Sequence, residues 1–220
     1  MGFSNPADVA RYAEGPPRMV PGFADMQRMA RVLLAESAPA DARVLVLGAG
    51  GGLELKAFAD AHAGWTFDGV DPSAEMLALA LRTVDPHAGR VTLHEGYIDV
   101  APEGPFDAAA CLLTMHFMTL DERRHALAAI RRRLRPGAPF VVAHLSFAPE
   151  QADRWLARDE AFAVSAGVGP AQARQRREVI GATLPVLAPG QDEALLREAG
   201  FRDVDLFYVG GIFRGWIGYA

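Results

Sequence analysis

Residues 44–55 read VLVLGAGGGLEL, and this stretch decides the fold. A run of β-branched residues and leucines at 43–47 ends in glycines at positions 48, 50, 51 and 52. A helical pattern follows from residue 53 to about 61. Glycine lets a backbone approach a ligand without a Cβ in the way, and the N-terminus of a helix offers free N–H groups. The stretch therefore predicts a strand, a ligand-binding loop and a helix in succession.

The next predicted strand, residues 66–71, ends in an acid whose spacing from the glycine loop is informative. Asp71 lies 23 residues after Gly48. In nucleotide-binding α/β folds an acid about 20 residues after the glycine loop reaches the ribose hydroxyls. The dinucleotide fingerprint fails because Leu53 stands where its third glycine is required, and Lys56, the only lysine, lies in no P-loop motif. The pattern G-x-G-x-G fits, and a merely tight turn is the alternative.

Strand and helix signals alternate through the first two thirds of the chain. Ser73 is expected to cap a helix that runs to about residue 82, and a second helix is expected at 121–134. Such alternation predicts a parallel sheet with helices on both faces. The five strands expected in it span residues 43–47, 66–71, 90–96, 106–113 and 138–147.

The last third breaks the alternation. Residues 149–182 are mostly helical in pattern, 191–199 form a short helix closed by Gly200, and a glycine turn joins strands at 201–209 and 212–220. We therefore predict an α/β fold of one domain, residues 1–220. Its Rossmann-like seven-stranded mixed sheet combines five parallel strands with a C-terminal antiparallel hairpin.

Two helical segments are expected to lie over the ligand sites. Residues 149–190 form a helical insertion over the substrate site, and residues 1–40 form an N-terminal helical lid or pack against the sheet. The lid prediction rests on apolar side chains at the N-terminus: Phe3, Tyr12, Met19, Phe23, Met26 and Met29.

Composition excludes several classes of protein. The net charge is −5, which argues against a nucleic-acid partner. One cysteine, Cys111, cannot form an internal disulfide or a thiolate metal cluster, and the histidines lack metal-site spacing, so no metal is expected. The start lacks a signal-peptide pattern, and the longest uncharged stretch, residues 136–149, has 14 residues, too few for a membrane helix. A cytoplasmic location is the expectation.

Five segments together resemble the class I S-adenosylmethionine (SAM)-dependent methyltransferases: VLVLGAGGG, FDGVDPSAEML, FDAAACLL, LRPGAPFVV and the AGF before the final hairpin. The resemblance implies SAM as cofactor, with its methionine part on the glycine loop, its ribose on the acid after strand two and its adenine near the residue after strand three. The cofactor-binding residues so implied are Arg18, Phe23, Gly48, Ala49, Gly50, Asp71, Pro72, Met76, Tyr97, Ile98 and Leu112.

A closer resemblance is to the carboxy-SAM synthases, bacterial enzymes that make a carboxymethyl donor for tRNA modification. It rests on RMVPGFADM, DERRHAL and REAGFRDVDLFYVGGIF. Three of that family's polar contacts are replaced here, by Phe23, Tyr97 and Leu112, and only its arginine is matched, by Arg177. The resemblance therefore implies a related SAM-binding enzyme and not the carboxy-transfer chemistry.

Three residues are candidates for a catalytic role. His116 and His144 follow or end strands at the carboxyl edge, where ligands bind α/β folds, and either could be a structural histidine. Arg177 belongs to an arginine cluster in the insertion and could bind a carboxylate or be a solvated charge. We predict methyl transfer from SAM to a small molecule. The alternatives are a carboxy-SAM synthase-like enzyme and a non-catalytic SAM-binding protein, and a homodimer is an open option.

Overall fold

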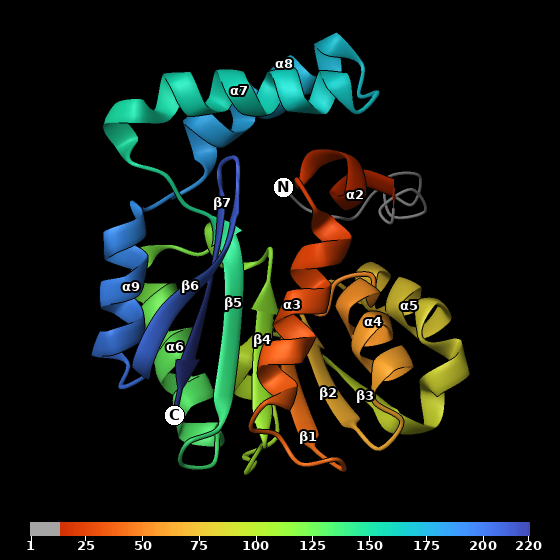
Figure 1. Cartoon of the computed structure of the whole chain (residues 1–220). Coiled ribbons are helices and arrows are strands. Elements are labelled where there is room, and N and C mark those ends of the chain that lie inside the picture. The colour runs from red at the N-terminus through yellow and green to blue at the C-terminus, as the bar shows by residue number, and fades with distance from the viewer. Residues whose placement is uncertain (1–13) are drawn as a thin grey trace.

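The computed structural model describes residues 14–220 and shows a seven-stranded sheet flanked by helices (Figure 1). Phe3 and Tyr12 lie outside the described residues. The strand order is β3-β2-β1-β4-β5-β7-β6. The strands are β1 (Arg43–Leu47), β2 (Thr66–Asp71), β3 (Val91–Glu95), β4 (Ala108–Leu112), β5 (Pro139–Leu145), β6 (Arg202–Gly210) and β7 (Phe213–Tyr219).

The predicted fold class is confirmed, and the structure adds how the hairpin joins the sheet. Strands β1 to β5 pair in parallel. Strand β7 pairs antiparallel with β5 over its whole length, from Pro139↔Tyr219 to Leu145↔Phe213, and antiparallel with β6 on its other side. The last strand of the chain is therefore inserted between β5 and β6. Only β7 runs against the other strands, and β6 becomes one edge of the sheet, opposite β3.

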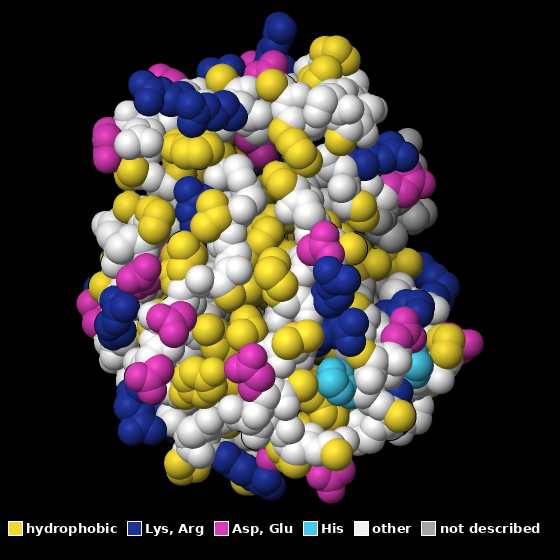
Figure 2. Space-filling model, in the orientation of Figure 1, with side chains coloured by type: hydrophobic (Ala, Val, Ile, Leu, Met, Phe, Trp, Pro, Cys, Tyr) yellow, Lys and Arg dark blue, Asp and Glu magenta, His cyan; other side chains and the backbone are white. Residues whose placement is uncertain are grey.

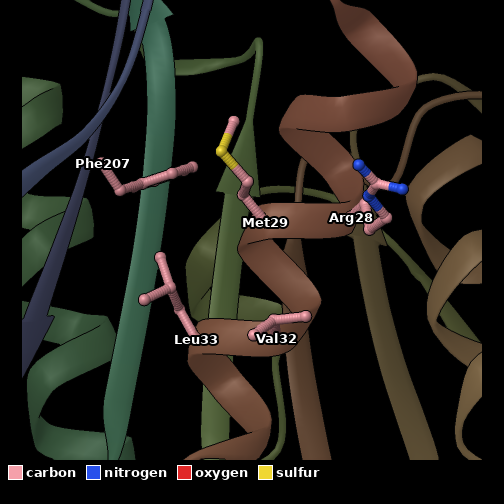
Figure 3. A pocket seen from close by; sticks show the side chains of 5 residues that line it. All are labelled: Arg28, Met29, Val32, Leu33 and Phe207. Carbon is pink, nitrogen blue, oxygen red and sulfur yellow. The ribbon is translucent and has the colours of Figure 1, made fainter.

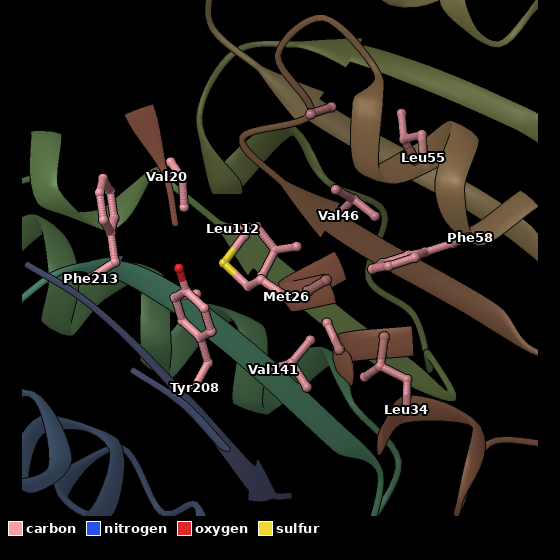
Figure 4. Packing of buried hydrophobic residues seen from close by; sticks show 14 of the residues in the cluster. Val20, Met26, Leu34, Val46, Leu55, Phe58, Leu112, Val141, Tyr208 and Phe213 are labelled. Carbon is pink, nitrogen blue, oxygen red and sulfur yellow. The ribbon is translucent and has the colours of Figure 1, made fainter. Parts of the chain in front are cut away.

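Helices cover both faces because alternate strand residues point to opposite sides. On one face α3 (Phe23–Ala35) and α4 (Leu53–Ala61) pack against a cluster that includes Val46 and Val141, shown in Figure 4. On the other face α6 (Leu120–Arg133) and α9 (Pro189–Glu198) pack against a cluster that includes Leu45 and Val142. Helix α5 (Ala74–Thr83) packs beside α4 against β2 and β3. Both faces of the central parallel strands β1, β4 and β5 are thus buried, whereas β3, at an edge of the sheet, is partly exposed.

Two helices form a hairpin beyond the carboxyl ends of the parallel strands, α7 (Ala152–Ser165) and α8 (Pro170–Thr183) (Figure 1). The short helix α2 (Gly15–Met19) contacts α7. Of the segment predicted as an N-terminal lid, α2 lies with this hairpin, whereas α3 belongs to the helical layer against β4 and β5. No helix in residues 14–220 is long and apolar enough to span a membrane.

Short 3-10 helices complete the connections between the main elements. They are η2 (Asp85–Arg90), η3 (Ile98–Val100), η4 (Met115–Phe117) and η5 (Pro149–Gln151). Two of them, η3 and η4, directly follow the carboxyl ends of β3 and β4, so they border the edge of the sheet where ligands bind α/β folds.

Candidate site at the carboxyl edge of the sheet

The glycine loop is tied to the end of β2. The N–H groups of Gly48 and Ala49 both donate to the carbonyl oxygen of Val70, at 2.8 and 3.0 Å. Gly48 has a φ of +79°, which L side chains rarely adopt, and a Cβ there would overlap the side chain of Thr114. The loop therefore turns sharply because two backbone bonds hold it, and it packs closely against the residue that follows β4.

Asp71 joins the glycine loop to the start of α5. Its Oδ2 accepts a hydrogen bond from the N–H of Gly50 and its Oδ1 accepts one from the N–H of Ser73, each at 3.0 Å. Burial raises the pKa of this carboxyl, and the two backbone N–H groups oppose that rise. A carboxylate offers about four acceptor positions, so both oxygens can still accept hydroxyl donors from a ligand. Asp71 thus lies beside the glycine loop, and its contact with a cofactor ribose stays a prediction.

The loop also contains a backbone N–H group that has no acceptor among the described residues. Gly51 is buried, and its N–H donates to no protein group within residues 14–220. Buried backbone N–H groups are seldom left unpaired. This donor and the N-terminus of α4 immediately behind it form a place where the carboxylate of a ligand would be stabilised.

Two residues of this region were not anticipated from the sequence. Thr114 packs on Gly48 and donates its hydroxyl to the carbonyl of Leu112 at 3.1 Å. Glu54, in the first turn of α4, is 7% exposed, and burial raises its pKa to about 8 with a further contribution from Asp71. The signal in the sequence that marks Glu54 is an acid two residues after the last glycine of the loop.

The apolar residues predicted to border the cofactor lie on different parts of the edge. Met76 and Ile98 are buried, at the start of α5 and in η3. Leu112 and Ala49 are buried within the cluster that α3 and α4 cover. Tyr97 is 69% exposed, so its side chain is not packed into the protein. Pro72 is exposed directly after Asp71. A contact between these residues and adenine stays a prediction.

Two of the predicted cofactor contacts, Arg18 and Phe23, come from the N-terminal segment. Arg18 of α2 is exposed, with its guanidinium 3.8 Å from the carboxylate of Glu14. Phe23, the first residue of α3, is partly buried against the cluster shown in Figure 4. Their roles toward a cofactor stay predictions.

Both candidate histidines are buried near the carboxyl ends of β4 and β5. Burial lowers the pKa of His116 well below its usual value, and its Nδ1 accepts a long 3.5 Å hydrogen bond from the N–H of Leu145. His144 Nε2 lies 3.1 Å from Asp192 Oδ1 without hydrogen-bond geometry. Asp192 in turn pairs with Arg123 at 2.9 Å, and both side chains are almost completely buried.

Arg177 is engaged within the helical hairpin. Its Nη1 lies 3.2 Å from Oε2 of Glu160, which joins α8 to α7. The neighbouring Arg176 pairs with Asp159 across the same two helices. The hairpin therefore supplies its own carboxylates to the arginines that were candidates for binding a ligand's carboxylate.

Hollows in the surface lie elsewhere. Figure 3 shows a groove of about 270 Å³ between α3 and the sheet, lined by Arg28, Met29, Val32, Leu33 and Phe207. Exposed hydrophobic side chains also gather around this part of the face in Figure 2. A second hollow, of about 390 Å³, lies between α3 and α4. Neither includes the glycine loop or Asp71. In residues 14–220 no group of His, Cys, Asp and Glu side chains could hold a metal ion.

Comparison with known proteins agrees with this architecture. A family model described as a methyltransferase domain matches residues 44–137, which include the glycine loop, Asp71 and both segments that follow β3 and β4. None of the curated proteins matches the chain.

Solved structures match over nearly the whole chain. A putative O-methyltransferase from Nostoc punctiforme is 18% identical, with a TM-score of 0.72, 99% of this chain covered and 61% of that one. Human N-acetylserotonin methyltransferase, solved with SAM, is 17% identical, with a TM-score of 0.59, 100% of this chain covered and 60% of that one.

A third structure is a Haemonchus contortus phosphoethanolamine N-methyltransferase solved with SAM. It is 16% identical, with a TM-score of 0.69, 98% of this chain covered and 57% of that one. At these identities the likeness is one of fold. The chain spans about three fifths of the length of these three structures.

Proposed function

We propose that this protein is a SAM-dependent methyltransferase that acts on a small-molecule acceptor. One observation carries the proposal: Asp71 is held by the N–H groups of Gly50 and Ser73, so that its carboxylate stands beside the glycine loop at the carboxyl edge of the sheet. The match to a methyltransferase domain over residues 44–137 and the methyltransferase folds of the structural neighbours support it.

The residues of the loop are suited to this cofactor. Asp71 has acceptor positions left for the two ribose hydroxyls, and the free N–H of Gly51 suits the methionine carboxylate. Ile98 and Met76 offer apolar surface at the next strand end and helix start, where the adenine ring would lie. The acid, the donor and the apolar surface occur in the order in which the cofactor's parts would meet them.

The cofactor, when bound, supplies a methyl group activated by a positively charged sulfur. The chain's own task is then to orient the acceptor in line with that methyl group and to exclude water. The α7–α8 hairpin and α2 lie beyond the strand ends, where they would close over an acceptor (Figure 1).

A general base is required only when the acceptor atom arrives protonated. Of the two candidate histidines, His144 has ring nitrogens without a hydrogen bond in residues 14–220, and it is the one we propose for that role. Its Nε2 faces Asp192, which favours a proton on Nε2 and leaves the Nδ1 lone pair free. His116 already accepts a backbone N–H at Nδ1, so its neutral ring carries the proton on Nε2 and is a donor there.

The carboxy-SAM synthase-like alternative finds less support. Arg177, which would meet the additional carboxylate, is engaged by Glu160. The side chains that would assist it are the hydrophobic Leu112 and Phe23 and the exposed Tyr97. A single arginine without supporting contacts is a poor basis for selecting an additional carboxylate.

The proposal is tested by binding and turnover measured together. Calorimetry should show that SAM and its demethylated product, S-adenosylhomocysteine (SAH), both bind. Formation of SAH should then depend on one member of a panel of phenols, amines, thiols and carboxylic acids. Mass spectrometry of any copurified ligand separates SAM from carboxy-SAM. Absence of SAM binding would refute the proposal. Binding in which no acceptor of any class promotes SAH formation would favour a non-catalytic SAM-binding protein.

A further inference from the structure

The buried acids of this protein differ in how their charge is balanced. Four of the five in residues 14–220 have an arginine partner: Asp68 with Arg43, Asp107 with Arg135, Asp159 with Arg176 and Asp192 with Arg123. The fifth, Glu54, forms no ion pair with any residue in that part of the chain. A buried carboxylate without a cation is costly, so its presence calls for a reason.

Glu54 lies directly behind the glycine loop that the proposed cofactor would contact. It follows Gly52 by two residues in the first turn of α4, and its own backbone N–H donates to its carboxylate. The groups facing it are the carboxyl of Asp71, from the end of β2, and the thiol of Cys111, from β4. Asp71 likewise has backbone N–H partners and no cation among the described residues. Two carboxyl groups that have no counter-ion within residues 14–220 therefore flank the glycine loop.

Two such groups suit a ligand that brings positive charge. SAM carries a net charge of +1 because its sulfur is a sulfonium, whereas SAH has a neutral sulfur and no net charge. We propose that Glu54 makes the site discriminate between them, its carboxylate being the counter-charge that favours the cationic cofactor over its neutral product. This inference rests on the proposed function and names the residue that would set its preference for substrate over product.

The protonation state of Glu54 provides a measurable test of this role. Burial raises the pKa of Glu54 to about 8, and the negative charge of Asp71 contributes to that rise. Burial also raises the pKa of the Cys111 thiol, so that thiol stays neutral. In the free protein at pH 7 Glu54 is therefore mostly protonated. A cation favours the ionised form, so binding SAM releases a proton, and the affinity for SAM rises with pH up to about 8.

SAH supplies the internal reference. It has the same carboxyl group and ribose as SAM, so titration of Asp71 against the ribose affects both ligands alike. Glu54→Gln provides the reference for the amino group, whose titration the sulfonium alters. The ratio of the two affinities isolates the response to the sulfonium charge. A Glu54 that is only structural would remain protonated in every state and leave that ratio independent of pH.

The experiment is titration calorimetry of wild-type protein and Glu54→Gln with SAM and with SAH, between pH 6 and 8. In the wild type we expect the preference for SAM to increase at least tenfold over this range, and about one proton to be released at pH 7. Glu54→Gln should lose about tenfold in SAM affinity at pH 8, keep SAH affinity within about threefold and release no proton. Asp60→Asn, which removes an exposed acid of the same helix, should behave as the wild type.

The possible outcomes distinguish a failure of the proposed role of Glu54 from a failure of the proposed function. If wild-type protein binds both ligands with a ratio that does not change with pH, the inference is overturned while the cofactor assignment stands. Equal losses of SAM and SAH in Glu54→Gln overturn it as well, since they show a structural role. If the wild type binds neither ligand, the proposed function fails and the inference fails with it. The wild-type measurements decide even if the variant does not fold.

Discussion

The two parts of the carboxyl edge differ in whether their acidic residues have cationic partners. Around the glycine loop, Asp71 and Glu54 have no cationic partner, and the N–H of Gly51 has no acceptor in the described chain. Around α6, α7, α8 and α9 the buried acids Asp159 and Asp192 each pair with an arginine. Acids without a counter-ion indicate where a cationic ligand would complete the protein, and acids paired with an arginine indicate architecture.

In the second part, the paired charges of Arg123 and Asp192 stabilise the tertiary structure. Arg123 is 1% exposed and contacts Asp192 of α9 at 2.9 Å, the carbonyl of Pro185 at 2.6 Å and the carbonyl of Met118 at 3.2 Å. One side chain thereby joins α6 to the segment before α9 and to α9 itself. The contacts with Pro185 and Asp192 span more than 60 residues of sequence, so they stabilise tertiary structure and not a local element.

The comparison predicts its largest effect on stability at this cluster. Asp192→Ala leaves the buried guanidinium of Arg123 without its carboxylate, so we expect the free energy of unfolding to fall by about 3–5 kcal/mol. Urea denaturation measures the change. Asp192→Asn keeps an acceptor oxygen and should lose less. A loss below about 1 kcal/mol for Asp192→Ala would show that the buried pair contributes little to holding α6 and α9 together.

The next effect lies in the glycine loop. Gly48→Ala combines a strained φ of +79° with an overlap on Thr114, which together should cost about 2–4 kcal/mol of stability. Thermal unfolding measures it. In a Thr114→Gly background the same substitution should recover the part due to overlap and keep the part due to φ. Equal costs in both backgrounds would contradict the close packing of Thr114 on the loop.

The third effect concerns ligand affinity. Asp71→Ala removes the acceptor for the ribose hydroxyls and should weaken SAM about tenfold or more in calorimetry, which corresponds to about 1.4 kcal/mol. Glu75→Ala, an exposed acid in the first turn of α5, is the matched control and should leave the affinity within about threefold. Unchanged affinity in Asp71→Ala would remove the cofactor assignment and, with it, the contrast between the two parts of the edge.

The smallest effect is expected at Arg177. Its partly exposed pair with Glu160 should contribute at most about 1 kcal/mol, and Arg177→Ala should leave SAM affinity within about threefold. Urea denaturation and calorimetry measure the two quantities. A carboxymethylated cofactor found bound, with Arg177 on its carboxylate, would overturn this expectation and support the carboxy-SAM synthase-like alternative.

Local signals in the amino-acid sequence determine most of the secondary structure. The predicted helix from residue 53 to about 61 agrees with α4, and Ser73 caps α5 as expected, with its Oγ accepting the N–H of Met76 at 3.2 Å. Glycines, caps and hydrophobic periodicity act within a few residues, so they can be recognised in sequence alone. The proximity of Asp71 to the loop was predictable as well, because neighbouring parallel strands end at the same edge.

Tertiary structure decided which groups meet across longer distances. The insertion of β7 between β5 and β6, the pairing of Arg177 with Glu160 and the approach of Asp192 to His144 join segments that no local pattern connects. Burial decided the rest, since the sequence presents Glu54 as an ordinary acid in the first turn of a helix. Only the packing of α4 behind the glycine loop removes it from water and raises its pKa, because desolvation depends on everything that surrounds a carboxyl group and not on its neighbours along the chain.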